Sequence, residues 1–318
     1  MEVDALPDER RYEMTGRTMG SVLDLIGNTP LVELSRDWTN GTSRILAKLE
    51  GANPTGSLKD RIARYMIEQA EREGRLKKHH IIVEGSSGNT GISLGMVCSL
   101  MGYKCRIFMP ESKSKERRLL IRLWGAELVL TDGSDPYSHI NLATEAGTKY
   151  PDEFFFIDQN GNKANSDAHY FGTGAEIVEQ VNGDVDAFVA GIGTGGSLMG
   201  VGRRLKERWP NAKIYQVEPS QPISKIEGLI HLEEGAFRPG ILEEGIIDEV
   251  IYVTDDDALV GCRLLNQNDG LFCGISSGAV VHAAKKIAQA SPGSTVVVLL
   301  GDRGDRYMST ALCDPYRD

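Results

Sequence analysis

Short apolar runs alternate with amphipathic segments along most of the chain. In runs such as Thr295–Leu300 (TVVVLL) every residue but the first is apolar, which is typical of parallel strands buried on both faces. In segments such as Leu58–Glu73, apolar residues recur at helical spacing between charged ones, which predicts an amphipathic helix. The alternation of such strands and helices favours the α/β class, in which helices cover a parallel sheet.

The pattern of apolar residues predicts the strands and helices along most of the chain. One long segment has neither the helical nor the strand pattern. Strands are predicted at Arg44–Glu50, His80–Glu84, Cys105–Met109, Glu127–Thr131, Phe154–Ile157, Asp186–Ala190, Lys213–Glu218, Val250–Val253 and Thr295–Leu300. Helices are predicted at Leu58–Glu73, Thr90–Met101, Ser114–Trp124, Ser197–Trp209, Asp255–Asn268 and Ser277–Ala290. The irregular segment is Ser220–Gly245. Because loops of this length inside a compact domain are usually functional, we expect a lid or a binding loop there.

The composition is that of an ordinary globular protein. The chain has 318 residues, 41% of them apolar and 25% charged, which favours about two domains. A net charge of −10 argues against a nucleic-acid partner, since such partners are bound by basic surfaces. The five cysteines form no C-x-x-C pair, which fits a reducing compartment and predicts no metal site. With no signal-peptide pattern and no membrane-length apolar run, we expect a cytoplasmic protein without a membrane partner.

A glycine-rich loop follows one predicted strand. Gly191–Ser197 (GIGTGGS) opens a predicted helix, and the backbone N–H groups of such a loop form a phosphate cradle. The loop also satisfies G-x-G-x-x-G, and Glu218 follows at the end of the next strand, so an NAD-dependent Rossmann dehydrogenase is an alternative. That motif usually opens its domain, however, and here it follows some 190 residues of other strands and helices. The loop therefore predicts phosphate binding rather than NAD binding.

Lys59 has an unusual place for a lysine. It follows the turn Asn53–Ser57 (NPTGS) at the start of a predicted helix, where a cation faces the positive end of the helix dipole. This position disfavours the ammonium form and frees the amine as a nucleophile. Ser57 is the expected N-cap of the helix. A solvated surface lysine is the alternative, and the turn and the unfavourable charge make it the weaker interpretation.

Two further strand-to-helix junctions are rich in hydroxyl groups. Ser86–Gly91 (SSGNTG) offers hydroxyls, an amide and free N–H groups, which suit a carboxylate. Cys273–Gly278 (CGISSG) is by itself a capping motif with two serines. Since ligands collect at the carboxyl ends of parallel strands, we expect all four loops to meet. A reactive amine, a phosphate cradle, a carboxylate site and a neutral hydroxyl fit an amino acid held as a Schiff base on a phosphorylated aldehyde cofactor.

Four motifs in order, NPTGSLKDR, SSGNTG, GIGTGGS and GISSG, resemble those of the fold-type II pyridoxal-phosphate enzymes, specifically the cysteine synthases (O-acetylserine sulfhydrylases). The likeness extends from about Ile26 to the C-terminus, and Asp302–Thr310 is similar to the ending of the B-type enzymes. It implies a tryptophan synthase β-like α/β fold with two domains of parallel or mixed sheet flanked by helices. The smaller, mobile domain would be residues 54–163 and bind the substrate carboxylate. The larger domain, residues 1–53 with 164–318, would bind the cofactor phosphate.

The same resemblance implies a role for each motif residue. Lys59 would carry pyridoxal 5'-phosphate as a Schiff base and move the α-proton of the substrate. The cofactor would also be held by Asn89 at its phenolic oxygen, by Gly193, Thr194, Gly195, Gly196 and Ser197 at its phosphate, and by Ser276 at its pyridine nitrogen. The substrate carboxylate would be bound by Ser86, Ser87, Asn89, Thr90 and Gln159.

The implied reaction is a β-replacement that forms L-cysteine from O-acetyl-L-serine and sulfide or thiosulfate. Cystathionine β-synthase, serine/threonine dehydratase and O-phosphoserine sulfhydrylase activities are alternatives of the same fold type. Ser220 stands where phosphoserine-using relatives carry an arginine, which disfavours the last of these. The resemblance also implies a homodimer, and it leaves open whether a serine acetyltransferase docks at the site.

Overall fold

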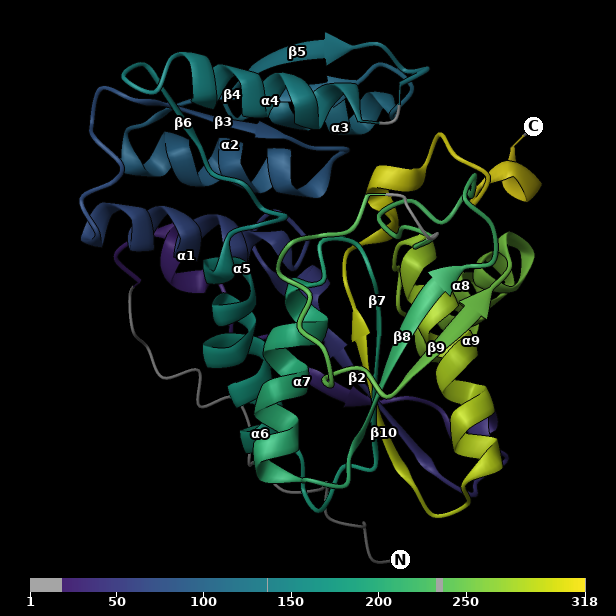
Figure 1. Cartoon of the computed structure of the whole chain (residues 1–318). Coiled ribbons are helices and arrows are strands. Elements are labelled where there is room, and N and C mark those ends of the chain that lie inside the picture. Colours follow the sequence, from purple (N-terminus) through teal and green to yellow (C-terminus); the bar gives the residue numbers. More distant parts are fainter. Residues whose placement is uncertain (1–18, 136, 233–236, 318) are drawn as a thin grey trace, which may run out of the picture.

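Two sheets form the framework of the protein (Figure 1). The computed structural model describes residues 19–317 except 136 and 233–236. The larger sheet has six strands in the order β1 (Leu31–Glu33), β2 (Arg44–Leu49), β10 (Thr295–Leu300), β7 (Ala187–Gly191), β8 (Lys213–Pro219) and β9 (Glu249–Val253). The smaller sheet has four, in the order β5 (Glu127–Thr131), β4 (Lys104–Pro110), β3 (Ile81–Gly85) and β6 (Phe154–Phe156). All neighbours pair in parallel except β1 and β2, which are antiparallel.

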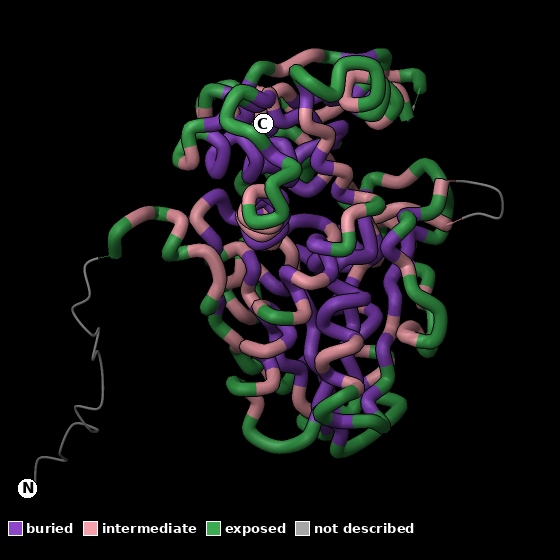
Figure 2. The backbone as a smooth tube through the Cα atoms, turned by 60° about the vertical axis from the view of Figure 1, so that its left-hand side comes forward, coloured by how far each residue is buried: buried purple, intermediate pink, exposed green. Residues whose placement is uncertain are grey.

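Helices cover both faces of the larger sheet, because its strands carry apolar residues on both sides. On one face α8 (Asp255–Asp269) and α9 (Ile275–Ala290) pack against residues such as Val189 and Val298. On the other face α6 (Ala175–Gln180) and α7 (Gly196–Arg208) pack against residues such as Phe188. Figure 2 shows the buried backbone running through the centre of this layered part.

The smaller sheet is covered in the same way. The larger of its two cores joins β3 and β4 to α1 (Lys59–Arg72), α2 (Asn89–Met101), α3 (Lys115–Leu123) and α5 (Lys163–Ala168). On the other face α4 (Ser138–Lys149) places Ala143 against Val83, Phe108 and Phe154. Helix α1 packs against α2, on the side away from the smaller sheet, and the loop that leads into α1 comes from β2 of the larger sheet (Figure 1).

All nine predicted strands and all six predicted helices are present, and no end differs from its predicted position by more than two residues. The elements that the pattern missed are short or weakly amphipathic. Strand β1 has three residues, and α4 buries only His139 and Ala143 among its side chains. Within its described residues, Ser220–Gly245 contains no helix or strand, as predicted. The division of the chain at residues 54 and 163 stays a prediction.

In the part of the chain that the structure describes, no helix combines the length and the apolarity that a bilayer crossing needs.

Candidate active site

Two of the four predicted loops, the Lys59 turn and the glycine loop, follow strands at the same edge of the larger sheet. The Ser86–Gly91 loop follows β3 of the smaller sheet, and Cys273–Gly278 follows helix α8, so its interpretation as a strand-to-helix junction is wrong. Strands β2, β10 and β7 lie side by side, with Leu300 opposite Leu49 and Val298 opposite Val189. The chain that leaves β2 leads to Lys59, the chain that leaves β7 forms the glycine loop, and β10 is followed by Asp302. This carboxyl edge is where ligands bind in parallel sheets.

Lys59 is the first residue of α1, and its amine is enclosed although the residue keeps partial exposure. Gly56 makes the preceding turn with φ +85°, a backbone conformation that favours glycine. Burial lowers the pKa of Lys59 to about 8, and the charge of Asp302 opposes this shift. The cause is therefore desolvation, and the amine is far easier to deprotonate than that of a surface lysine.

The expected N-cap role of Ser57 is wrong in detail. The N-cap position is Leu58, which has no side-chain capping bond, because the first turn begins one residue later than predicted. The Ser57 hydroxyl still accepts a hydrogen bond from the Lys59 backbone N–H over 3.3 Å.

The loop before α2 and the loop after β6 are tied together. The Ser86 hydroxyl accepts hydrogen bonds from the N–H groups of Gly88 and Gly91, each over 3.1 Å. Thr90 Oγ1 donates to Gln159 Oε1 over 2.6 Å, and Gln159 Nε2 donates to the Gly85 carbonyl over 3.1 Å. Four of the predicted carboxylate-binding residues, Ser86, Ser87, Thr90 and Gln159, thus lie on two linked loops, where Ser87 is exposed and the other three are buried.

Asn89 is held by the segment that follows β10. Its Nδ2 donates to Asp302 Oδ2 over 2.7 Å, and Arg306 Nη1 donates to its Oδ1 over 2.5 Å. Arg306 belongs to η5 (Gly304–Tyr307), whose Tyr307 hydroxyl also donates to Asp302 Oδ2, over 2.7 Å. The orientation of the Asn89 amide is therefore set on both sides.

The glycine loop has the shape of a cradle that side chains would fill. Gly195, with φ +85°, is the N-cap of α7, and the first N–H groups of a helix have no intrahelical partner. A Cβ at Gly193 would come within 2.7 Å of the Gly228 carbonyl oxygen, and one at Gly196 would overlap Asn165 Oδ1. Asn165 Nδ2 donates to Thr194 Oγ1 over 3.0 Å, which ties the loop to helix α5. With Ser197 buried in the first turn, these donors suit a phosphate.

Ser276 lies in the first turn of α9, partly exposed. Helix α9 begins at Ile275 with Gly274 as N-cap and has no side-chain capping bond, so the interpretation of Cys273–Gly278 as a capping motif is wrong. The Gly274 N–H instead donates to the Asp302 carbonyl over 3.1 Å. This bond places the Ser276 turn beside the segment that holds Asn89.

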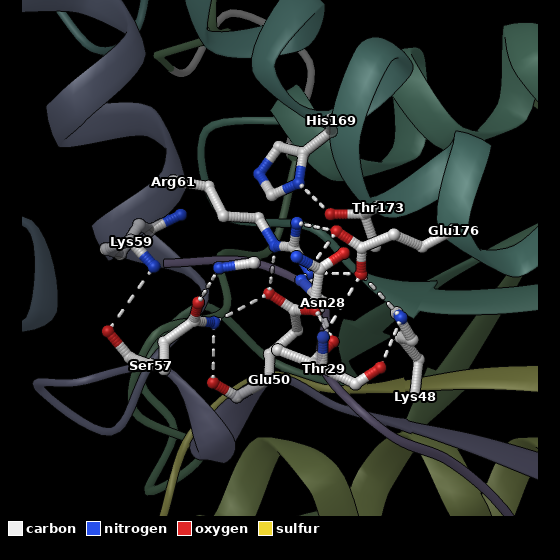
Figure 3. Close-up of polar contacts among 12 residues, drawn as sticks. Asn28, Thr29, Lys48, Glu50, Ser57, Lys59, Arg61, His169, Thr173 and Glu176 are labelled. Carbon is white, nitrogen blue, oxygen red and sulfur yellow. Dashed lines mark hydrogen bonds and ion pairs between the residues drawn. The ribbon is translucent and has the colours of Figure 1, made fainter. Parts of the chain in front are cut away.

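Three residues of this site were not found by sequence reasoning: Asp302, Arg306 and His169. Asp302 and Arg306 had no assigned role, although they follow the central strand of the sheet at its carboxyl end, and that position was the available signal. His169 is fully buried close to Lys59 (Figure 3). Burial first, and then the charge of Lys59, hold the pKa of His169 well below its usual value, so the ring is neutral.

A buried ion cluster anchors the helix that begins with Lys59 (Figure 3). Arg61 Nε donates to Glu50 over 2.7 Å and Arg61 Nη1 donates to Glu176 over 2.6 Å. Lys48 donates to Glu176 over 2.7 Å and to the Thr29 carbonyl over 2.7 Å. Burial alone would raise the pKa of Glu176, but Arg61 and Lys48 outweigh it and lower that pKa to about 2. The first turn of α1 is thereby fixed to β2 and α6.

Glu84 is a fully buried carboxyl group beneath the two linked loops. It accepts hydrogen bonds from the Gly85 and Gln159 backbone N–H groups, each over 3.0 Å. Burial nevertheless raises its pKa from 4.5 to about 8. Glu84 is therefore largely protonated in the folded protein at neutral pH.

This shift predicts a pH dependence of stability that Glu84→Gln removes. Between pH 4.5 and about 8 the folded protein keeps a proton that the unfolded chain has lost, so stability falls as pH rises through that window. Melting temperatures of both proteins from pH 5 to 8.5 test this. We expect the wild type to lose more stability than the variant, and parallel curves would contradict the assignment.

The donor set fits a phosphorylated aldehyde. A desolvated amine, a phosphate cradle and an oriented amide lie at one edge of the sheet, and Asp302 Oδ1 and Ser277 Oγ are buried polar atoms without a protein partner. Among the residues described here, no group of three or more His, Cys, Asp or Glu side chains is arranged to hold a metal ion.

Known proteins are similar to this chain in sequence and fold over nearly its whole length. The family model described as pyridoxal-phosphate dependent enzyme matches residues 22–302. Cysteine synthase of Staphylococcus aureus strain Mu50 is 43% identical over 307 residues, which cover 94% of this chain and 98% of that protein. The crystal structure of an O-ureido-L-serine synthase has a TM-score of 0.89 at 37% identity, covering 95% of this chain and 97% of that one. An O-acetylserine dependent cystathionine β-synthase from Helicobacter pylori has a TM-score of 0.87 at 33% identity, covering 93% and 99%.

Proposed function

Because the chain belongs to the pyridoxal-phosphate-dependent enzymes, and among them to the cysteine synthase family, we propose that it makes L-cysteine from O-acetyl-L-serine and sulfide. The chain is a fold-type II enzyme of β-replacement that uses pyridoxal 5'-phosphate and forms cysteine. The identity of the donor and of the acceptor is the proposal.

The observation that carries this proposal is the amine of Lys59. It is enclosed, its pKa is lowered to about 8, and it begins a helix that the Arg61 cluster holds in place. Bound pyridoxal phosphate supplies an aldehyde that condenses with amines and a ring that accepts electrons from the substrate Cα. An amine that exchanges protons near neutral pH is suited both to hold this cofactor and to move the Cα proton.

The loops around Lys59 support the remaining roles. We assign the cofactor phosphate to residues 193–197, because their N–H groups and the start of α7 form an anion site. Asn89 would donate to the phenolic oxygen of the cofactor, and the neutral hydroxyl of Ser276 would face its ring nitrogen. A neutral partner leaves that nitrogen without a full charge, which favours loss of the β-substituent over other outcomes.

The substrate carboxylate would lie on the two linked loops of the smaller sheet. Ser86, Ser87, Asn89, Thr90 and Gln159 offer hydroxyl and amide donors there, and the start of α2 adds a positive dipole. We propose that residues 54–163 move as a unit to close this loop over the substrate, which would exclude water from the reacting carbon.

The choice of acceptor separates this proposal from its alternatives. Relatives of similar fold include an O-ureido-L-serine synthase and an O-acetylserine dependent cystathionine β-synthase. The acceptors to be tested are therefore sulfide, thiosulfate and homocysteine. The donors to be tested are O-acetylserine, O-phosphoserine and serine. A homodimer and a cytoplasmic location belong to the proposal; light scattering on the purified protein tests the first.

The experiment is a visible absorbance scan of the purified, cofactor-loaded protein as each donor is added in turn. We expect O-acetylserine to shift the cofactor band, sulfide to restore it, and cysteine to appear in step. A shift reversed only by homocysteine would assign cystathionine synthesis instead. If no donor shifts the band, the proposed reaction is wrong.

A further inference from the structure

Asp302 lies buried between the loops of the site, outside the motifs that the cofactor and substrate roles use. We propose that Asp302 is a positioning residue, in which one carboxylate oxygen orients Asn89 toward the cofactor and the other is the counter-ion that Lys59 meets when its amine is protonated and released. This inference rests on the proposed function and adds a residue to its machinery.

The backbone of Asp302 is fixed from two sides. Asp302 forms an isolated β-bridge with Ser57, and the Leu58 N–H donates to the Gly301 carbonyl over 2.9 Å. On the other side the Gly274 N–H donates to the Asp302 carbonyl over 3.1 Å. The position of the carboxylate therefore depends on both the Lys59 turn and the Ser276 turn.

The contact with Asn89 selects which amide hydrogen faces the cofactor. The Asn89 amide has two hydrogens on Nδ2 and one acceptor oxygen. One hydrogen on Asn89 Nδ2 is donated to Asp302. The Asn89 oxygen accepts a hydrogen bond from Arg306, which is 1% exposed. One donor hydrogen remains in a fixed direction. A donor set in this way binds a ring oxygen without first losing rotational freedom.

The second carboxylate oxygen of Asp302, Oδ1, is unusual because it is buried and has no hydrogen-bond partner. Asp302 is 3% exposed, and its Oδ1 has no hydrogen-bond partner, whereas its Oδ2 accepts from Asn89 and Tyr307. A buried carboxylate oxygen without a partner is costly. Its charge acts on Lys59, since it raises the pKa of that amine against the effect of burial. An oxygen that lacks a permanent partner suits a cation that is present only in part of the cycle.

Other ionisable groups surround this pair and are left in place when Asp302 alone is substituted. They are Arg306 and Tyr307 on η5, Arg117 on α3 over the Tyr307 ring, Cys262 on α8, Cys273 before α9, and His169 of η4 (His169–Gly174), which faces Lys59. Burial raises the pKa of both thiols to about 12, so both are neutral near pH 7. Near neutral pH the charge removed by substituting Asp302 is therefore the main electrostatic change around Lys59.

The test is the reactivity of Lys59 in cofactor-free protein that carries Asp302→Asn. The labelling rate with cyanate is followed from pH 6 to 10 by mass spectrometry of the Lys59 peptide, with the exposed Lys149 as the internal standard. Loss of the negative charge lowers the pKa of Lys59. We expect labelling of Lys59 at pH 7 to be about threefold faster in the variant than in the wild type, because a modest fall in the pKa of a mostly protonated amine raises its unprotonated fraction by about that factor.

In the loaded enzyme we expect kcat to fall about tenfold or more, with the donor KM changed less than about threefold, because Asp302 is not one of the residues assigned to the substrate carboxylate.

Tyr307→Phe is the matched control, because it removes a hydrogen bond from Asp302 Oδ2 and leaves the charge in place. We expect its Lys59 profile to match that of the wild type. If Asp302→Asn does not fold, Asp302→Ser takes its place, since its hydroxyl can still accept from Tyr307. An unchanged Lys59 profile in a folded Asp302 variant overturns the inference. Failure of the proposed function is distinct, because it would show as a wild type whose cofactor band O-acetylserine does not shift, whereas the Lys59 profile of the cofactor-free protein does not depend on the donor.

Discussion

Lys59→Ala is expected to remove the visible absorbance band of the purified enzyme and to lower kcat/KM by about 10⁴-fold or more. The variant loses both the attachment point of the cofactor and the group that moves the Cα proton, and each contributes several orders of magnitude. Borohydride treatment followed by peptide mass spectrometry checks this directly: the wild type should carry the reduced cofactor at residue 59, and the variant should carry none there.

Lys149→Ala is the control for this experiment, because Lys149 is an exposed lysine on α4 that pairs with Glu145. It should keep both the band and the activity. A Lys59→Ala enzyme that remains coloured, active and tagged elsewhere would show that another amine holds the cofactor.

Arg61→Met is expected to reduce the free energy of unfolding by about 3–5 kcal/mol, because it removes one partner from a buried ion cluster. Glu50 is fully buried, and Arg61 supplies two of its hydrogen bonds. Glu176 keeps Lys48 as a partner, whereas Glu50 would have only the neutral donors Thr29 and Asn53. Urea denaturation of the cofactor-free protein measures the loss.

Arg64→Met, one turn further along the same helix, is the control for Arg61. Arg64 pairs with Glu68 at the surface, where both side chains are about one-third exposed, and such pairs contribute at most about 1 kcal/mol. Adding Glu50→Gln to Arg61→Met should recover part of the loss, since it removes the stranded charge. Equal effects of the two arginine variants would show that the cluster adds no more stability than a surface pair.

The sequence predicted the strands better than the contacts at the site. Buried parallel strands such as β10 are apolar along their whole length, so a short window of residues identifies them. Strand β1 has three residues and pairs antiparallel with β2, and nothing in so short a run distinguishes it from a loop.

The sequence located the candidate site where one motif forms one structural feature, as at the Lys59 turn and the glycine loop, and the roles of these residues stay a proposal. The site was not predictable where it depends on contacts between distant segments. Asn89 and Asp302 are 213 residues apart, and Arg61 and Glu176 are 115 apart. A single sequence does not show such pairs, because they form only when segments far apart in the chain fold against one another.

The position of β10 also bears on how the chain is synthesised. Among the described strands it comes last in the sequence, yet it lies between β2 and β7, which are made much earlier. We expect the smaller sheet, whose strands all lie between residues 81 and 156, to be complete while those two strands still have unpaired edges. Nascent or truncated chains that end before residue 295 would expose these edges, and exposed strand edges are sites of aggregation.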